Sequence, residues 1–317
     1  MFARGLGMAV GVVSDLWFGD PRRGHPVALF GSGAAALERR TYADDRRAGV
    51  AHIAALLGAV GAAGLVLERA ARRRSGWAEA ACVAAATFTA AGGTTLSRTG
   101  EHMAELLGAG DIDGARRLLP SLCGRDPSVL DAAGLTRAAL ESIAENTSDA
   151  QIGPLVWAAL GGTPGVLVYR GANTLDAMIG SRSSRYVRFG WAAARFDDLV
   201  NLVPARVTGL LVVLCAPAVG GSPVGAWRAW RRDADRHPSP NAGVAEAAFA
   251  GALGVRLGGP TQYAHELEIR PTLGDGRVPA VDDLARAVRL SRAVQLVAAA
   301  AAVSVACRSG RRVSARW

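Results

Sequence analysis

Residues 141–206 read ESIAENTSDAQIGPLVWAALGGTPGVLVYRGANTLDAMIGSRSSRYVRFGWAAARFDDLVNLVPAR. Acidic, amide and arginine side chains recur in this stretch, and strongly apolar segments separate them. Glu141, Glu145 and Asp149 lie four residues apart, so a helix of 3.6 residues per turn places them on one face. Such a row is usually a solvated helix face with ion pairs between turns. The apolar segments around it favour the alternative, a polar site within an apolar helical protein.

Two further polar groups follow in the same stretch. Asn173 and Asp176 are three residues apart, and Asp197 lies four residues before Asn201 and next to Asp198. Each group can present oxygen ligands from one helix face. The arginines that can bind anions here are Arg170, Arg182, Arg185 and Arg206. Clustered carboxylates and amides with several arginines suit a site for Mg²⁺ and a phosphate-bearing ligand.

The composition indicates a membrane protein. Half of the 317 residues are hydrophobic, and the mean hydropathy is +0.19. The net charge is +9, and every basic side chain apart from the five histidines is arginine, because the sequence contains no lysine. The arginines are dispersed around apolar segments without any nucleic-acid-binding signature, so we expect no nucleic-acid partner.

Several common catalytic and metal-binding patterns are missing from the sequence. The four cysteines are scattered, which argues against both a disulfide framework and a zinc site. A Walker A motif is excluded because it needs a lysine, and neither HExxH nor GxSxG occurs.

The apolar segments predict the membrane helices. Val50 to Leu67 has about the length that a ~30 Å hydrocarbon core requires. With a second run from Trp77 to Leu96 and a basic linker, it predicts a helical hairpin. Residues 199–219 and 293–306 are further candidates. Residues 152–168 contain three Gly or Pro breaks, which predict a re-entrant or broken element.

The remaining segments have other expected structures. Residues 1–18 predict a retained helix rather than a cleaved signal peptide, because Asp15 interrupts the apolar run and no convincing cleavage site follows. We expect residues 97–150 and 223–285 to be mainly extramembrane helices and loops. Within them, Asn241 is a candidate helix cap, and a small hairpin is expected near residues 269–278.

Long blocks of the sequence resemble the CobD/CbiB family of cobalamin biosynthesis. They are GDPRRGHPV at 19–27, LSRTG at 96–100, ARRLL and GRDPS between 115 and 128, ESIAENTSDAQIGPLVWAALGG at 141–162, YRGANTLDAMIGSRSSRYVRFGWAAARFDDLVNLVPAR at 169–206, and HPSPNAGVAEAAFAGALGVRLGG at 237–259. The blocks follow the family order and span nearly the whole chain. The sequence departs from the family pattern at Ala150 and Gly153, where we expect a glycine and an alanine.

The resemblance implies an all-α, polytopic membrane protein forming a single domain over residues 1–317. It also implies a ligase activity of the adenosylcobinamide-phosphate synthase type. Such an enzyme joins aminopropanol or its phosphate to the propionate carboxylate of adenosylcobyric acid. A carboxylate is a poor electrophile, so the resemblance implies ATP and Mg²⁺ and an acyl phosphate. It does not distinguish the free amine from its phosphate.

The resemblance and the clusters together suggest roles for individual residues. The expected catalytic residues are Glu141, Glu145, Asp149, Asp176, His25 and His237, of which the two histidines are candidate proton acceptors. The expected Mg²⁺ ligands are Glu145, Asp149, Asp176, Asp197 and Asp198. Phosphate binding is expected from Arg170, Arg182 and Arg185, with Arg206 as a further anion-binding side chain, and corrin amides are expected to bind Asn146, Asn173 and Asn241. Of these residues, Glu145, Asp149, Asn173, Asp176 and Asp197 are expected to converge on one cavity.

Two other classes of function stay open at this point: a non-catalytic membrane sensor or assembly factor, and a transporter of corrinoids or anions. The family form of the block at 237–243 argues against the first. The expected location is the inner cell membrane, with the active site facing the cytoplasm. Expected partners, besides substrates and the lipid bilayer, are other late enzymes of the cobalamin pathway and further copies of the chain.

Overall fold

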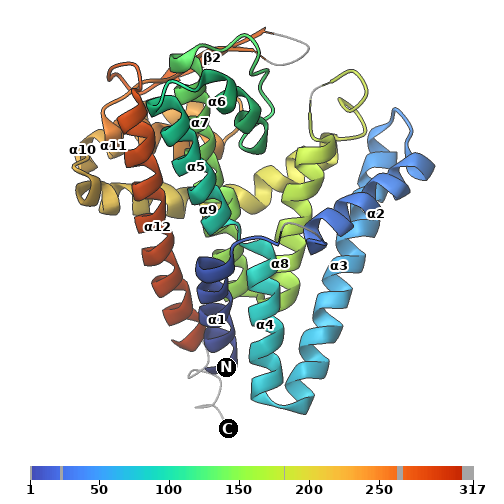
Figure 1. Ribbon diagram of the computed structural model, residues 1–317. Coiled ribbons are helices and arrows are strands. Elements are labelled where there is room, and N and C mark those ends of the chain that lie inside the picture. Colours follow the sequence, from blue (N-terminus) through green and yellow to red (C-terminus); the bar gives the residue numbers. More distant parts are fainter. Residues whose placement is uncertain (1, 22–23, 182, 263–266, 309–317) are drawn as a thin grey trace. The chain divides into compact units, whose positions relative to one another are not determined.

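The computed structural model describes residues 2–21, 24–181, 183–262 and 267–308. Helices dominate these residues, and the strands among them form one two-stranded sheet (Figure 1). The predicted all-α class is thereby confirmed, with this small sheet as an addition. The chain divides into two compact units. Unit 1 is Met1–Gly92, Gly153–Asn201 and Ala299–Trp317, and unit 2 is Gly93–Ile152 and Leu202–Ala298.

Within the described residues, four helical segments are long and apolar enough to cross a membrane. They are Arg46–Arg74, Ala132–Ile179, Trp191–Val219 and Val281–Arg308. The span predicted from residue 50 to residue 67 lies inside the first of these, and those predicted at 199–219 and 293–306 lie inside the last two. The predicted extramembrane segments 97–150 and 223–285 both fall in unit 2; their position outside a membrane stays a prediction.

Unit 1 is built from long helices. They are α1 (Phe2–Phe18), α2 (Pro26–Thr41), α3 (Arg46–Arg74), α4 (Gly76–Ala90), α8 (Gly153–Ile179), the first part of α9 (Trp191–Cys215) and the end of α12 (Val281–Arg308). Helix α1 packs against α4, and α3 packs against α8 (Figure 1). At Gly7 a β-carbon would lie 2.5 Å from the carbonyl oxygen of Ala80. A glycine there lets the backbones of α1 and α4 approach closely.

Helices α3 and α4 form the predicted hairpin, but its second arm is shorter than expected. The Ser75 hydroxyl accepts a hydrogen bond from Ala78 N at 3.0 Å and caps α4. Helix α4 ends at Ala90 instead of continuing to Leu96, and α5 begins at Gly93. The 15 residues of α4 cover about 22 Å, which is less than the ~30 Å of a hydrocarbon core. The Ala-Gly-Gly sequence at 91–93 separates the two helices, although the apolar composition continues across it and had predicted one uninterrupted helix.

The predicted broken element is confirmed within α8. Gly162 has φ 62° and ψ −147°, which interrupts the helix, and Pro164 follows. The amide freed by this kink belongs to Thr163, and it donates to Glu68 Oε2 at 2.6 Å. Arg4 and Arg72 bind the same carboxylate at 3.1 and 2.8 Å. A buried carboxylate thus satisfies the broken backbone, as an apolar surrounding requires.

Unit 2 combines short helices with the sheet. Its elements include α5 (Gly93–Gly108), α6 (Ile112–Leu118), α7 (Ala132–Asn146), a π-helical segment (Thr147–Ile152), α10 (Pro223–Asp233), α11 (Ala242–Leu253), β1 (Leu257–Gln262) and β2 (Leu267–Leu273). Nearly all of α11 is buried, and α7 and α10 pack against it. The short apolar helix α11 is therefore the core of this unit.

The prediction of a hairpin near residues 269–278 was misplaced by several residues. The antiparallel hairpin pairs β1 with β2, and its register shifts between Leu257 and Gly259. Gly258 and Gly259 have φ values of +82° and +88°. These glycines form an irregular strand, and a Gly-Gly-Pro sequence looks like a loop when read without its partner.

Candidate functional site

A chain of hydrogen bonds in unit 1 begins at a buried tyrosine of α8. The Tyr169 hydroxyl donates to Asn201 Oδ1 at 2.8 Å, and Asn201 Nδ2 donates to Asp197 Oδ2 at 2.9 Å. Tyr169 and Asn201 are each 1% exposed. Asp197 Oδ1 is buried and has no hydrogen-bond partner among the described residues. One oxygen of this carboxylate is thus held by Asn201, and the other is buried close to Asn173.

Other predicted site residues gather at Asp197. Asn173 and Asp176 of α8 both interact with its carboxylate, as does the charge of Asp198. Asp198 also forms an ion pair with Arg195 at 3.3 Å. The structure thus brings together four predicted residues of unit 1, from α8 and α9, as their helical spacing suggested.

The departure from the family pattern at Gly153 has a steric explanation. A β-carbon at this position would lie 2.0 Å from the hydroxyl oxygen of Tyr169 and 2.1 Å from its Cζ atom. Any larger residue at 153 would displace the tyrosine ring that holds Asn201. Gly153 therefore belongs to the support of the acidic cluster.

Arg170 is a cation with no counter-ion among the residues that the structure describes. It lines a pocket of about 100 Å³ together with apolar side chains that include Val27, Phe30, Val60 and Leu167. Its guanidinium contacts Asn173 Oδ1 at 3.4 Å, its Nε is buried without a hydrogen-bond partner, and it forms no ion pair with a described residue. A half-buried cation in apolar surroundings favours an anionic ligand.

Other predicted arginines differ from Arg170. Arg185 donates to Glu38 Oε1 at 2.8 Å and stacks over the Tyr42 ring at 4.1 Å, so protein partners already engage it. Arg182 lies outside the described residues. In unit 2, Arg206 donates to Asn241 Oδ1 at 2.7 Å. Asn241 occupies the N-cap position of α11 as predicted, but its side chain makes no capping hydrogen bond; the Ser239 hydroxyl accepts from the amides of Asn241 and Ala242 instead.

The two predicted histidines have the same local structure. Each precedes a proline, and each accepts a hydrogen bond at Nδ1 from the amide two residues later: Val27 N to His25 at 3.2 Å and Ser239 N to His237 at 3.0 Å. In a neutral His25 ring the proton then lies on Nε2, whereas His237 Nδ1 also lies 3.2 Å from the Ser239 carbonyl oxygen, to which it can donate in the other tautomer. Proton acceptance at Nδ1 would require these turns to open, so their first role is structural.

Unit 2 contains a buried cluster with charges of both signs. Glu141, 2% exposed, is ion-paired with Arg125 through Oε2 and accepts the Gly258 amide at Oε1 over 2.6 Å. Arg137 donates to the carbonyl oxygens of Gly258 and Pro260 at 2.7 and 2.5 Å. Both oxygens of Glu141 are occupied, and they tie the hairpin to α7.

Next to Glu141 lies a second buried acid, Glu246 of α11. Its Oε1 lies 3.6 Å from His237 Nε2 and 4.0 Å from Arg270 NH1. Burial, with the nearby charges of Glu141 and Glu145, raises the pKa of Glu246 well above its usual value. Burial and then the charge of Arg270 lower the pKa of His237. Neutral forms of both groups are therefore favoured.

The remaining predicted residues lie at the end of α7. Glu145 is half-buried and interacts with Arg270 and Arg125. Asn146 donates back to the Ser142 carbonyl at 2.9 Å. Asp149 lies in the π-helical segment Thr147–Ile152. Such a widened turn is rare and is frequent at functional sites.

The predicted Mg²⁺ site can be compared with the side chains that could serve as metal ligands. Among the described residues, no three His, Cys, Asp or Glu side chains are arranged to hold a metal ion. Mg²⁺ in phosphate-binding sites commonly uses one or two carboxylates and shares the rest with phosphate and water. The carboxylate of Asp197 beside Asp176 fits that donor set, so the Mg²⁺ assignment stays a prediction. The convergence of both clusters on one cavity also stays a prediction.

Sequence reasoning missed several residues that complete these clusters. They are Arg125, Tyr169, Glu246 and Arg270. The first three lie inside the sequence blocks that resemble the family, and this position could have marked them as candidates. Arg270 lies outside them and is placed by the strand pairing.

Comparison with known proteins identifies the family. The family described as CobD/CbiB protein matches residues 8–291. The chain belongs to the CobD/CbiB family. The Cobalamin biosynthesis protein CobD of Mycobacterium tuberculosis (strain ATCC 25618 / H37Rv) is 64% identical over 305 residues, covering 96% of each chain. Proteins of the same name from Geobacter metallireducens and Chromobacterium violaceum are 42% and 41% identical, covering 88% and 90% of this chain and 89% and 91% of their own lengths. No solved structure matches the chain.

Proposed function

We propose that this CobD/CbiB family member acts in cobalamin biosynthesis as an ATP-dependent ligase. In the proposed reaction, (R)-1-amino-2-propanol or its O-phosphate is joined through an amide bond to the propionate carboxylate of adenosylcobyric acid. The observation that carries the proposal is the buried acidic and amide cluster of Asp176, Asn173, Asp197 and Asn201, in a chain of this family.

The chemistry requires activation of the carboxylate. A carboxylate oxygen attacks the terminal phosphorus of ATP, ADP leaves, and an acyl phosphate forms. The amine nitrogen then attacks the acyl carbon, the C–O bond to phosphate breaks, and amide, inorganic phosphate and a proton result. The anionic groups of ATP need cations in both steps.

Residues of unit 1 are suited to these needs. Asp176 and Asp197 would hold Mg²⁺, which supplies positive charge to the phosphate oxygens of ATP when bound. Arg170 would bind a phosphate group, because its guanidinium forms no ion pair within the described part of the chain. Tyr169 and Asn201 orient Asp197 through their hydrogen bonds. Glu145, Asp149 and Asp198 stay proposed ligands, and Asn146, Asn173 and Asn241 stay proposed partners of corrin amides.

The four candidate spans support a location in the cell membrane. The proposed use of ATP requires the site to face the cytoplasm, where ATP is available. The arginine runs at both ends of α3 leave the orientation of this helix undecided by charge alone.

The test is an assay of the full chain in lipid nanodiscs with adenosylcobyric acid, aminopropanol or its phosphate, ATP and Mg²⁺. Mass spectrometry should detect the amide, with ADP formed in equal amount. Asp197→Asn should abolish most of the activity, whereas Asp113→Asn, at an ion-paired but 77% exposed side chain, should not.

Each other outcome contradicts part of the proposal. Amide formation without ATP would eliminate the acyl phosphate but keep the ligase. Corrinoid uptake into vesicles without amide formation would indicate a transporter. Absence of both activities in a folded protein would favour a non-catalytic role.

A further inference from the structure

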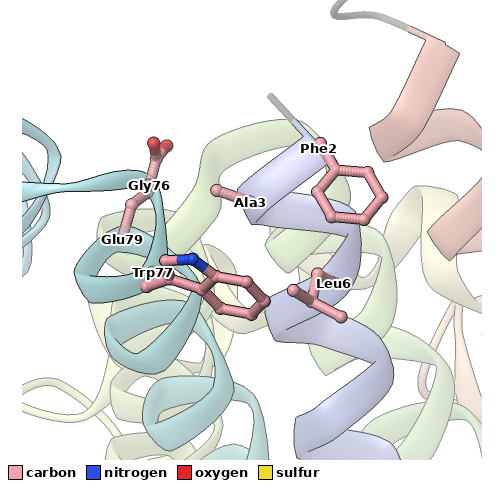
Figure 2. Close-up of a pocket in the computed structure, with 6 residues that line it drawn as sticks. All are labelled: Phe2, Ala3, Leu6, Gly76, Trp77 and Glu79. Atoms are coloured by element: carbon pink, nitrogen blue, oxygen red, sulfur yellow. The ribbon is translucent and has the colours of Figure 1, made fainter.

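One end of unit 1 carries an apolar pocket beside a run of arginines. The pocket has a volume of about 370 Å³ and lies between α1 and α4 (Figure 2). It is lined by Phe2, Ala3, Leu6, Gly76, Trp77 and Glu79. The Phe2 and Trp77 side chains are 73% and 77% exposed. Trp77 begins α4 directly after the membrane-length helix α3, and an exposed tryptophan at such a position is typical of a membrane–water interface.

The arginine run directly precedes this pocket in the chain. Helix α3 ends with Arg69, Arg72, Arg73 and Arg74, and α4 begins at Gly76. Arg72 is already paired with Glu68 and Glu79 at 2.8 and 2.9 Å. Arg69, Arg73 and Arg74 are exposed and form no ion pair with any residue that the structure describes. The free charge at this end is therefore positive, although Glu79 lines the pocket.

Ion pairs connect the helices that surround the pocket. Glu68 joins Arg4 of α1 to Arg72 of α3, and Arg72 joins Glu68 to Glu79 of α4. Glu68 and Glu79 are each 5% exposed. One network of charges thus connects α1, α3 and α4, and it reaches the pocket through Glu79.

We propose that this end of unit 1 binds one anionic phospholipid. The phosphate of its headgroup contacts Arg73 and Arg74, and one acyl chain lies in the pocket between α1 and α4. Charge complementarity selects this occupant, because apolar walls fit a hydrocarbon chain while the unpaired arginines require an anion. The acyl chain of a zwitterionic lipid would fill the pocket equally well, but its headgroup has no net negative charge and would bind the arginines more weakly.

The test uses the purified full chain in detergent, titrated with phosphatidylglycerol or with phosphatidylcholine of identical chains and followed by native mass spectrometry. The wild type should bind one phosphatidylglycerol more tightly than phosphatidylcholine. Arg73→Gln with Arg74→Gln should weaken phosphatidylglycerol binding roughly tenfold or more, with little effect on phosphatidylcholine.

Two matched variants separate the parts of the site. Arg39→Gln with Arg40→Gln removes another exposed arginine pair, at the end of α2, and should leave the preference intact. Leu6→Trp fills the pocket and should weaken both lipids equally. Unchanged elution and thermal midpoint of each variant show that it is folded, and the measurement does not depend on the proposed ligase reaction.

Three results would overturn the proposal. One is equal binding of the two lipids by the wild type. Another is an equal loss with both arginine pairs, which would indicate general charge attraction. The third is displacement of the lipid by millimolar inorganic phosphate, which would indicate a site for soluble phosphate instead.

Discussion

In unit 2 the buried carboxylate of Glu141 has a protein partner at each oxygen, Arg125 and the Gly258 amide. In unit 1 the buried carboxylate of Asp197 has one oxygen bound by Asn201 and the other without a hydrogen-bond partner among the described residues. The arginines follow the same division. Arg125 is paired with Glu141, whereas Arg170 has no ion-pair partner in the described part of the chain.

This difference separates structure from function among similar residues. Desolvating a charge is costly, so a buried charge needs a partner, either from the protein or from a ligand. Where the protein supplies it, as at Glu141, the charge holds the fold together. Where it is missing, as at Arg170, the residue is expected to act on a ligand. The predictions below test this division.

The largest effect is expected from Glu141→Ala. Removal of this carboxylate leaves Arg125, with a side chain 6% exposed, without its ion-pair partner and frees the Gly258 amide. Breaking a buried ion pair typically costs about 3–5 kcal/mol. Thermal unfolding of the protein in detergent should show a large loss of stability. Glu105→Ala, at a 76% exposed side chain, is the control, and an equal loss from both variants would refute the structural role of Glu141.

Arg170→Gln should behave in the opposite way. No ion pair is broken, so the thermal midpoint should hardly change, but the pocket loses its cation. A charge-assisted hydrogen bond contributes about 1.5–3 kcal/mol, so the KM of a phosphate-bearing substrate should rise roughly ten- to hundredfold. The measurement is steady-state amide formation as the concentrations of ATP and aminopropanol phosphate are varied separately. Arg188→Gln, 64% exposed in the same unit, serves as the control. An unchanged KM for both substrates would remove Arg170 from the site.

Gly153→Ala tests how the acidic cluster is supported. The new methyl group would meet the Tyr169 ring at 2.0–2.5 Å, and overpacking of this kind costs about 1–3 kcal/mol. The hydrogen bond from Tyr169 to Asn201 should be lost, so activity should fall together with stability. Adding Tyr169→Leu should restore much of the stability but not the activity. Recovery of both would show that the tyrosine does not position Asp197.

The helical fold and much of the candidate site were predictable because both depend on local spacing. Asn173 and Asp176 are one turn apart on α8, and Asp197 and Asn201 one turn apart on α9, so their shared faces follow from helix geometry. The broken helix was also predictable, because its glycines and proline are visible in the sequence.

What the sequence did not reveal depends on contacts between distant residues. The pairing of Glu141 with Arg125, and of Glu246 with His237, joins different elements. Local spacing does not distinguish Glu141 from Asp197, because it does not reveal which of the two carboxylates forms an ion pair with an arginine distant in sequence. The hairpin was misplaced for the same reason, because Gly258 is recognisable as a strand residue only through its partner strand.

The smallest effect concerns pH and the second acid of unit 2. Because the pKa of Glu246 is raised in the folded protein, its neutral form contributes stability that is complete below the ordinary pKa of about 4.3. That contribution is lost as the pH rises through the folded value. The groups facing it are Glu141, Glu145, Arg125, Arg270 and His237. Glu246→Gln cannot ionise, so between pH 5 and pH 8 it should avoid the loss of stability that the wild type shows. Thermal midpoints across this range, with Glu105→Gln as the exposed control, measure the difference. Parallel pH profiles of wild type and Glu246→Gln would mean that Glu246 is already charged and that Arg270 compensates it, which would make this acid resemble Glu141.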